Sequence, residues 1–509
     1  MPVWNFVRPN AYHDSVTLMR LTRDMEAVPG VTRTAAMMAT PANRALLTGA
    51  GLLTTDGERA GPADLVIAIT ADSAAAADTA RQAAESALTT GSVTTGAQAR
   101  PRTLAGALRI LPDATLALVS VPGPYAGAEA RAALRRGLDV MLFSDNVPLA
   151  TEVALKREAL ERGRFVMGPD CGTAILHGVP LGFANAVPRG RIGLVAASGT
   201  GLQEVTCRLA ATGEGVSHAI GVGSRDLSDE VGGAMTLAAL TALGADAATD
   251  VVVLIGKPPG ASVVTGLAAA LGALGKPVVV SLMGATSFPA IRGVHVAATL
   301  EDAALAATTL ARGEAPHPAA LALSADEIER LVEECGRTLA PGQRFVRGVY
   351  AGGTLAWEAA GLLAGHLENV APGVDGKGTD HRVVDLGDDR FTVGRPHPMI
   401  DGTVRREWIA REARDPATAV LLLDVVLGYG AHADPAGELV PALQAAREAA
   451  AGNGRGLVVV TSVIGTERDP QVRSSQVAAL RRASVLVMES NAQAARLAAL
   501  IAAHVEGRR

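Results

Sequence analysis

The segment IGLVAASGTGLQE, residues 192–204, joins an apolar strand to a helix through a glycine turn, and it decides the fold class. A second segment, VLLLDVVLGYGAHAD at residues 420–434, repeats this design. Each turn is expected to open a helix, where free backbone N–H groups and the helix dipole favour an anion. One such turn is a weak signal, because any α/β protein has several. Two of them predict a single phosphate held between two helix ends.

Short apolar runs of the same kind recur along the chain, separated by alanine-rich helical stretches. They occupy residues 63–70, 114–121, 138–144, 190–198, 249–256, 276–284, 420–428, 456–465 and 483–490. Runs rich in Val, Ile and Leu with helix-length spacers are typical of parallel strands that are buried on both faces. The sequence therefore predicts an α/β protein with several doubly wound parallel sheets.

Chain length and two joints divide the sequence into three expected domains. The 509 residues leave room for roughly three domains. Residues 187–191 are a plausible first joint, and the proline-containing stretch 311–325 is a second. We expect a Rossmann-like domain over residues 1–186. Two flavodoxin-like domains are expected over residues 187–325 and 326–509.

Composition excludes several classes of function. The net charge of −5 gives no electrostatic reason to expect nucleic acid or an anionic membrane as partner, and aromatic residues make up only 3%. No apolar run approaches membrane-spanning length, and the N-terminal segment lacks the apolar core of a secretion signal. Three widely spaced cysteines form neither a disulfide framework nor a zinc set. We therefore expect a cytoplasmic protein without a metal site.

The predicted phosphate site combines flexible backbone with hydroxyl groups at the two helix starts. Its residues are Ser198, Gly199, Thr200 and Gly201 in the first turn, and Gly428, Tyr429, Gly430 and Ala431 in the second. A third turn of this type, ranked lower, contains Gly352, Gly353 and Thr354 and is expected to contact substrate. A purely structural interpretation, with Ser198 as a helix N-cap, is also open.

Charged residues in loops after apolar runs supply the remaining candidates, because ligand sites of α/β proteins collect at strand ends. We expect catalytic roles for Arg225, His397 and His432. Substrate-binding roles are expected for Asp226, Arg395 and Arg468. Arginine suits phosphate, carboxylate and carbamoyl oxygens through its bidentate fork. Each residue alone is more often part of a loop salt bridge, so the prediction depends on the set lying together.

Longer motifs resemble succinyl-CoA synthetase. The first two thirds are similar to its alpha subunit, on VPGPYAGAEARAALRRGLDVMLFSDNVP (121–148), GPDCGTAI (168–175), AASGTGLQE (196–204) and AIGVGSRDL (219–227). The last third, with YAGGTLAWEA (350–359), LLLDVVLGYGAHADPA (421–436) and SVIGTERDP (462–470), is similar to the carboxyl-terminal domain of its beta subunit. The resemblance contains no ATP-grasp domain, and no Walker motif occurs in the chain.

The fused layout resembles the FdrA family, on this arrangement and on stretches such as MMATPANRALL (37–47) and TVGRPHPMID (392–401). The resemblance implies two labels: a subunit of a carbamoyltransferase acting on oxamate in allantoin breakdown, or an acyl-CoA synthetase. The first label makes carbamoyl phosphate a substrate and requires no cofactor. It also implies small-molecule substrates and co-encoded partner subunits in a hetero-oligomer.

The second label would require CoA, ATP and a phosphorylated histidine. His295 is the one candidate, and its setting in VHVAA predicts a short strand instead of the glycine-flanked loop of the succinyl-CoA synthetase phosphohistidine. We therefore favour carbamoyl transfer, with an acid–CoA ligase subunit as the alternative. A non-catalytic scaffold or ligand sensor of the same fold is a third possibility, because fold alone does not decide function.

Overall fold

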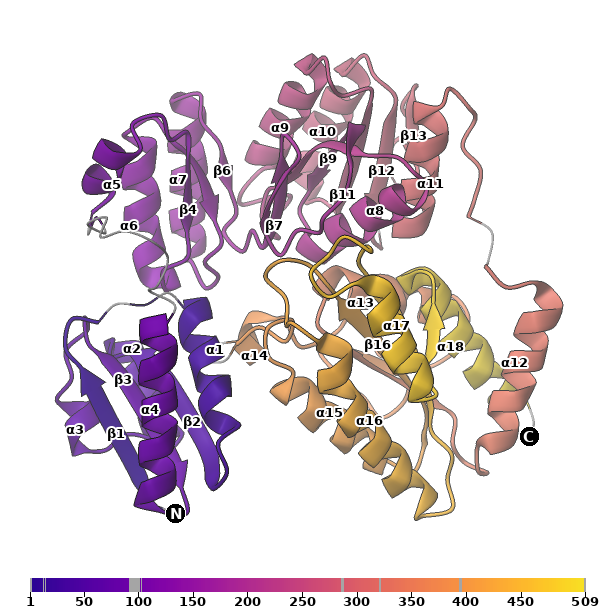
Figure 1. Ribbon diagram of the computed structural model, residues 1–509. Coiled ribbons are helices and arrows are strands. Elements are labelled where there is room, and N and C mark those ends of the chain that lie inside the picture. The colour runs from indigo at the N-terminus through magenta and orange to yellow at the C-terminus, as the bar shows by residue number, and fades with distance from the viewer. Residues whose placement is uncertain are drawn as a thin grey trace.

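The computed structural model describes residues 2–11, 13, 15–90, 101, 103–284, 288–319, 322–392 and 396–507. Its strands form four sheets, which lie in separate lobes in Figure 1. The α/β class predicted from the sequence is confirmed, and all nine predicted strand segments contain strands. In the described ranges, no helix combines the length and apolar character that a bilayer span requires.

The N-terminal lobe is a separate unit with an antiparallel sheet. Its elements are β1 (Val3–Arg8), α1 (Ser15–Glu26), β2 (Val31–Met38), α2 (Pro41–Gly49), α3 (Thr55–Glu58), β3 (Leu65–Ala71) and α4 (Ala74–Thr90). The strand order is β1-β3-β2, and β3 pairs antiparallel with both neighbours. The prediction of one Rossmann-like domain over residues 1–186 is therefore wrong. Apolar clusters cover both faces of β3, so its continuous apolar run imitates a buried parallel strand.

The second lobe is a small parallel sheet. It contains α5 (Leu104–Ile110), β4 (Leu116–Val119), α6 (Gly123–Leu134), β5 (Asp139–Leu142), α7 (Leu149–Glu161) and β6 (Val166–Met167). The three strands lie in chain order, β4-β5-β6, all parallel. Because the order never reverses, this sheet has no topological switch point, the place where open α/β sheets bind their ligands.

The third lobe is built on a seven-stranded sheet of order β13-β12-β11-β9-β10-β7-β8. It contains β7 (Thr173–Leu176), β8 (Val179–Gly182), β9 (Arg189–Ala196), α8 (Gly199–Ala211), β10 (Val216–Gly221), α9 (Ala234–Ala245), β11 (Val251–Gly256), α10 (Ala261–Ala273), β12 (Val278–Leu282), β13 (Val294–Val296) and α11 (Leu300–Ala311). Strands β7 and β8 belong to this sheet, so the domain begins before residue 187, earlier than predicted. From β9 the chain continues to β10 on one side of β9, and it later returns to form β11 on the other side of β9. Its switch point therefore lies at the carboxyl ends of β9 and β11.

The fourth lobe is built on a parallel sheet of order β15-β14-β16-β17-β18. It contains α12 (Ala325–Thr338), β14 (Phe345–Tyr350), α13 (Gly353–Ala364), β15 (Arg382–Asp385), α14 (Asp389–Thr392), α15 (Thr403–Arg414), β16 (Thr418–Val426), α16 (Pro435–Ala451), β17 (Val458–Ile464), α17 (Arg473–Arg482), β18 (Leu486–Met488) and α18 (Asn491–Glu506). By the same rule, its switch point lies at the carboxyl ends of β14 and β16.

The last two lobes share one apolar core, and helices α8, α11, α13 and α18 pack at their junction. Three carboxyl groups are buried in this junction: Glu204, Glu301 and Glu358. Glu301 is paired with Arg208 at 3.1 Å, whereas Glu358 accepts hydrogen bonds from the Leu300 N–H and the Asn491 amide. Burial, reinforced by the charge of Glu358, raises the pKa of Glu204 to about 8.

We expect the substitution Glu204→Gln to stabilise the protein at high pH. The folded pKa of Glu204 lies above its unfolded value of 4.5. The stability that the neutral acid provides is therefore complete below pH 4.5 and is lost as the pH rises through about 8. The variant cannot ionise at this position, so its advantage in denaturation experiments should grow with pH to roughly 1–3 kcal/mol. Parallel stability curves for the two proteins between pH 5 and 9 would contradict this. The control is Glu333→Gln, which alters an exposed pair with Arg337.

Candidate functional site: paired helix starts

The first predicted turn opens a helix as expected. Strand β9 ends at Ala196, and α8 begins at Gly199 after one capping residue. The Ser198 Oγ accepts a hydrogen bond from the Gly201 N–H at 2.9 Å, as an N-cap does. The same hydroxyl also donates to the Thr354 Oγ1 at 2.5 Å, although these residues are 156 positions apart. Ser198 therefore caps α8 and contacts a second helix.

That second helix is α13, which begins at Gly353 directly after strand β14. A methyl group on Gly352 would lie 2.9 Å from the Thr200 Oγ1 and Cγ2, so the close approach of the two helix starts requires glycine at this position. The lower-ranked turn, with Gly352, Gly353 and Thr354, is thus the partner of the Ser198 turn. The contact between these two turns brings the switch points of the third and fourth lobes together.

Backbone donors at both helix starts are available. The N–H groups of Gly199, Thr200, Gly353 and Thr354 have no protein acceptor in the part of the chain that the structure describes. Just before α13, the buried carboxylate of Asp424 accepts from the N–H groups of Ala351 and Gly352 at 2.9 and 2.7 Å. Two helix N-termini that face each other concentrate positive potential. This arrangement favours a polyvalent anion such as phosphate.

The turn with Gly428, Tyr429, Gly430 and Ala431 does not open a helix, so this part of the prediction is wrong. Helix α16 begins only at Pro435, where Asp434 caps it. The Gly428 N–H donates to Gln471, the Tyr429 N–H to the Ala184 carbonyl, and the Ala431 N–H to the Gly428 carbonyl. A methyl group on Gly428 would lie 2.2 Å from the Phe183 carbonyl oxygen. The glycines therefore serve close packing, and three of the four predicted donors are occupied.

Asp385 and His397 lie beside the start of α13. A methyl group on Gly353 would lie 2.5 Å from the Asp385 Oδ2, and one on Gly387 would lie 2.7 Å from the His397 Nε2 and 3.2 Å from the Asp385 Oδ1. The carboxyl and imidazole groups thus face the same small space. Burial raises the pKa of Asp385 to about 7, although the charge of Lys257 opposes this shift. Asp385 was not predicted, and its signal is an acid at the carboxyl end of β15.

His397 is an uncharged hydrogen-bond donor in this arrangement. Its half-buried ring packs against Phe183 with the ring centroids 5.8 Å apart. Burial lowers the pKa of His397 to about 4. The Nδ1 accepts a hydrogen bond from the Met399 N–H at 3.2 Å, so the ring proton resides on Nε2. His397 therefore lies beside the start of α13 with its Nε2–H free to donate a hydrogen bond, and its catalytic role stays a prediction.

The remaining predicted site residues are described by their partners and exposure. Arg225 is tied to Glu152 at 2.9 Å, and Asp226 has no exposed surface because it binds Lys156 and the start of α9. The substrate-binding prediction for Asp226 is therefore wrong. His432 lies in the Gly428 turn, where its Nδ1 accepts from the Asp434 N–H. Arg468 is exposed on the loop after β17, and Arg395 lies outside the described residues.

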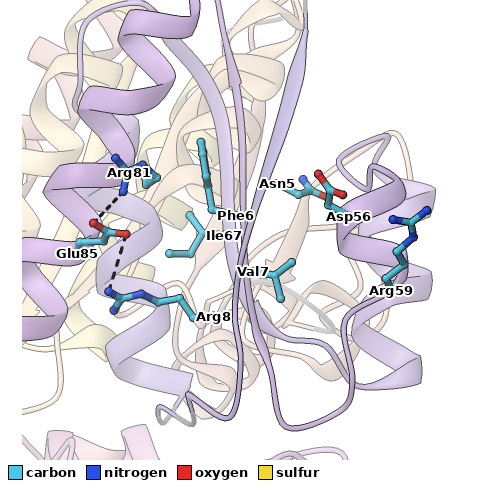
Figure 2. Close-up of a pocket in the computed structure, with 9 residues that line it drawn as sticks. All are labelled: Asn5, Phe6, Val7, Arg8, Asp56, Arg59, Ile67, Arg81 and Glu85. Atoms are coloured by element: carbon cyan, nitrogen blue, oxygen red, sulfur yellow. Dashed lines mark ion pairs between the residues drawn. The ribbon is translucent and has the colours of Figure 1, made fainter.

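Two further places in the fold are weaker candidates. His295 lies in β13 opposite Val279, which confirms the predicted strand. A cavity of about 580 Å³ lies along the edge strand β1. There Glu85 pairs with Arg8 at 3.8 Å and with Arg81 at 2.9 Å (Figure 2). These charges are already paired, and the cavity belongs to the N-terminal lobe. The paired helix starts are the stronger candidate.

The two α/β lobes that meet at their helix starts belong to a protein with a CoA-ligase-like fold. A domain family described as "CoA-ligase" matches residues 349–501, and one described as "AllF, heavy metal-associated domain" matches residues 1–103. The protein YahF of Escherichia coli K12, described as uncharacterized, is 38% identical over 98% of both chains. The chain therefore belongs to the family of YahF, the FdrA-type succinyl-CoA synthetase-like proteins.

The chain also has weaker similarities to other proteins. The succinate–CoA ligase alpha subunit of Methanothermobacter thermautotrophicus is 29% identical over 37% of this chain and 64% of its own. A solved dinucleotide-forming acetyl-coenzyme A synthetase of Ca. Korarchaeum cryptofilum is 15% identical, covering 77% of this chain and 84% of its own at a TM-score of 0.32.

The description of the N-terminal match refers to heavy metals. Residues 1–103 contain no cysteine, because the three cysteines are Cys171, Cys207 and Cys335. Within the described ranges, no group of three or more His, Cys, Asp or Glu side chains is suited to a metal ion. These residues do not fit a thiolate-bound metal.

Proposed function

We propose that this chain is a subunit of a carbamoyltransferase that uses carbamoyl phosphate and a small amide or amine acceptor such as oxamate, in allantoin or purine nitrogen breakdown. The observation that carries the proposal is the meeting of α8 and α13 with free N–H groups at both starts. Family membership supports it, because the FdrA family includes such a subunit. The phosphate would lie against Gly199, Thr200, Gly353 and Thr354.

The reaction needs few groups from the protein. The acceptor nitrogen forms a bond to the carbamoyl carbon, and the bond from that carbon to the phosphate oxygen breaks. The phosphate leaves with the bonding electrons, and the proton lost by nitrogen passes to it. The N–H groups stabilise charge that grows on the departing phosphate. The Nε2–H of His397 would donate to the carbamoyl oxygen, and neutral Asp385 to a phosphate oxygen.

The acid–CoA ligase alternative fits less well. A CoA-type nucleotide would need a crevice at a topological switch point of the second lobe. The sheet β4-β5-β6 has none, because the chain before β4 forms the separate antiparallel sheet. The alternative also needs a phosphorylated histidine, and His295 lies in the regular pairing of β13 with β12.

The proposal includes co-encoded partner subunits. The described site offers donors for a phosphate but few groups that could activate an acceptor nitrogen. Without full positioning of both reactants, most of the rate advantage of orientation is lost. We therefore expect a hetero-oligomer, in which the isolated chain binds carbamoyl phosphate but turns over slowly.

The test is a transfer assay with ¹³C-labelled carbamoyl phosphate and oxamate, with and without the co-encoded partners. We expect one carbamoylated acceptor for each phosphate released, and a rate that the partners raise by orders of magnitude. A parallel arm supplies ATP, CoA and succinate, and intact-mass analysis should show no phosphoryl group on the protein. Formation of ADP and succinyl-CoA, with phosphate on His295, would instead support the ligase alternative.

A further inference from the structure

Lys257 lies at the carboxyl end of β11, one of the two strands whose ends form the switch point of the third lobe. Strand β11 ends at Gly256, and Lys257 follows it beside the strand end that precedes α8. Gly256 is tightly enclosed, since a methyl group there would lie 2.8 Å from Leu227. Pro258 and Pro259 come next and restrict the backbone. The sequence GKPPG thus holds one lysine at the place where α/β sheets bind ligands.

The side chain of Lys257 lies toward α13. Its Nζ is 5.7 Å from the ring centroid of Trp357, within the range of a cation–π contact. Trp357 follows Gly353 by four residues, so both lie on one face of α13, the face that contacts Asp385. The charge of Lys257 also lowers the pKa of Asp385. Lys257, Trp357 and Asp385 therefore surround one end of the paired helix starts.

Among the described residues, no neighbouring group neutralises the charge of Lys257. In the ranges that the structure describes, no carboxylate lies within 4.0 Å of its Nζ and no acceptor is hydrogen-bonded to it. The contrast is Lys156, which is buried between Glu152 and Asp226 at 2.8 Å from each. Trp357 is 37% exposed and lies four residues before exposed Gly361, so its indole faces solvent on the exposed side of α13.

We propose that Lys257 and Trp357 form the acceptor subsite and select small planar acceptors that carry a carboxylate. This inference rests on the proposed function, in which the helix starts hold the phosphate. A second anion then needs its own cation close by, and Lys257 is an unpaired one at the switch point. The indole face offers a flat apolar surface for a planar amide. Selection follows because a neutral acceptor would leave the ammonium group without a counter-charge.

The test measures the affinity of the full chain with its partners for oxamate, for the uncharged analogue oxamide, and for sulfate as the phosphate probe. In Lys257→Gln, oxamate binding should weaken about 10- to 100-fold, whereas sulfate binding changes less than about threefold. Lys257→Arg should restore most of the oxamate affinity, and Trp357→Leu should weaken both oxamate and oxamide. The matched control is Lys377→Gln, which alters an exposed lysine paired with Asp375.

The outcomes distinguish the acceptor subsite at Lys257 from the phosphate site at the helix starts. Unchanged oxamate affinity in Lys257→Gln, with sulfate bound normally, overturns the acceptor subsite and leaves the phosphate site intact. An equal loss of sulfate and oxamate overturns it too, because Lys257 would then belong to the phosphate. If the wild-type protein binds no sulfate or carbamoyl phosphate, the proposed function fails and the inference fails with it.

Discussion

Replacing Gly353 by alanine should weaken carbamoyl phosphate binding at least about tenfold and slow transfer about 10²-fold or more, comparable to the loss of one oxyanion donor. The added methyl group would lie 2.5 Å from the Asp385 Oδ2, so the helix start or the carboxyl group must shift. Either movement displaces the N–H groups of Gly353 and Thr354 from the anion. Titration calorimetry with carbamoyl phosphate and a phosphate-release assay measure the two effects.

The same helix provides the matched control. Gly361 lies on the exposed side of α13, and a methyl group there would meet no atom within 4 Å. Gly361→Ala should therefore keep full affinity and raise helix stability by up to about 1 kcal/mol. Equal affinity in the two variants would mean that the start of α13 does not bind the phosphate.

The second large effect concerns the proton on Asp385. Because its pKa is raised to about 7, the carboxyl group is neutral below this pH and can donate to an anion. Above it, the carboxylate repels the anion. Sulfate does not titrate in this range, so its affinity reports Asp385 directly. We expect wild-type affinity to fall roughly tenfold between pH 6 and pH 8.

In Asp385→Asn the pH dependence should disappear, and sulfate should bind more tightly than to the wild type at pH 8. The control is Asp388→Asn, which removes an exposed carboxylate nearby and should keep the fall in affinity. Two results would show that another group controls anion binding. One is a wild-type sulfate affinity that stays constant through pH 7, and the other is a fall in sulfate affinity that persists in Asp385→Asn.

The sequence predicts the strands well and their partners poorly, for physical reasons. β11 is a continuous apolar run, and β16 is apolar except for Thr418 and Asp424; burial on both faces makes these strands evident from composition alone. The same reasoning assigns β3 to a parallel sheet, because a strand covered on both faces has one pattern in either direction. Strand direction depends on connections that local composition does not encode.

The candidate site shows the same limit. The Ser198 turn opens a helix as predicted, but the sequence offers several turns of similar glycine pattern as its partner. Gly428 adopts φ +132° to let the backbone pass Phe183, whereas Gly352 lets α8 approach α13. Both uses demand glycine, so only tertiary contacts distinguish them. Lys257 follows the end of β11 and Asp385 is the last residue of β15, which is a usable signal that glycine-centred motifs do not contain.

The most direct test is a crystal structure of the protein with carbamoyl phosphate or inorganic phosphate bound. We predict phosphate oxygens within about 3 Å of the backbone nitrogens of Gly199, Thr200, Gly353 and Thr354. A phosphate bound at the Gly428 turn, or helix starts that bind no anion at saturating ligand, would contradict the account.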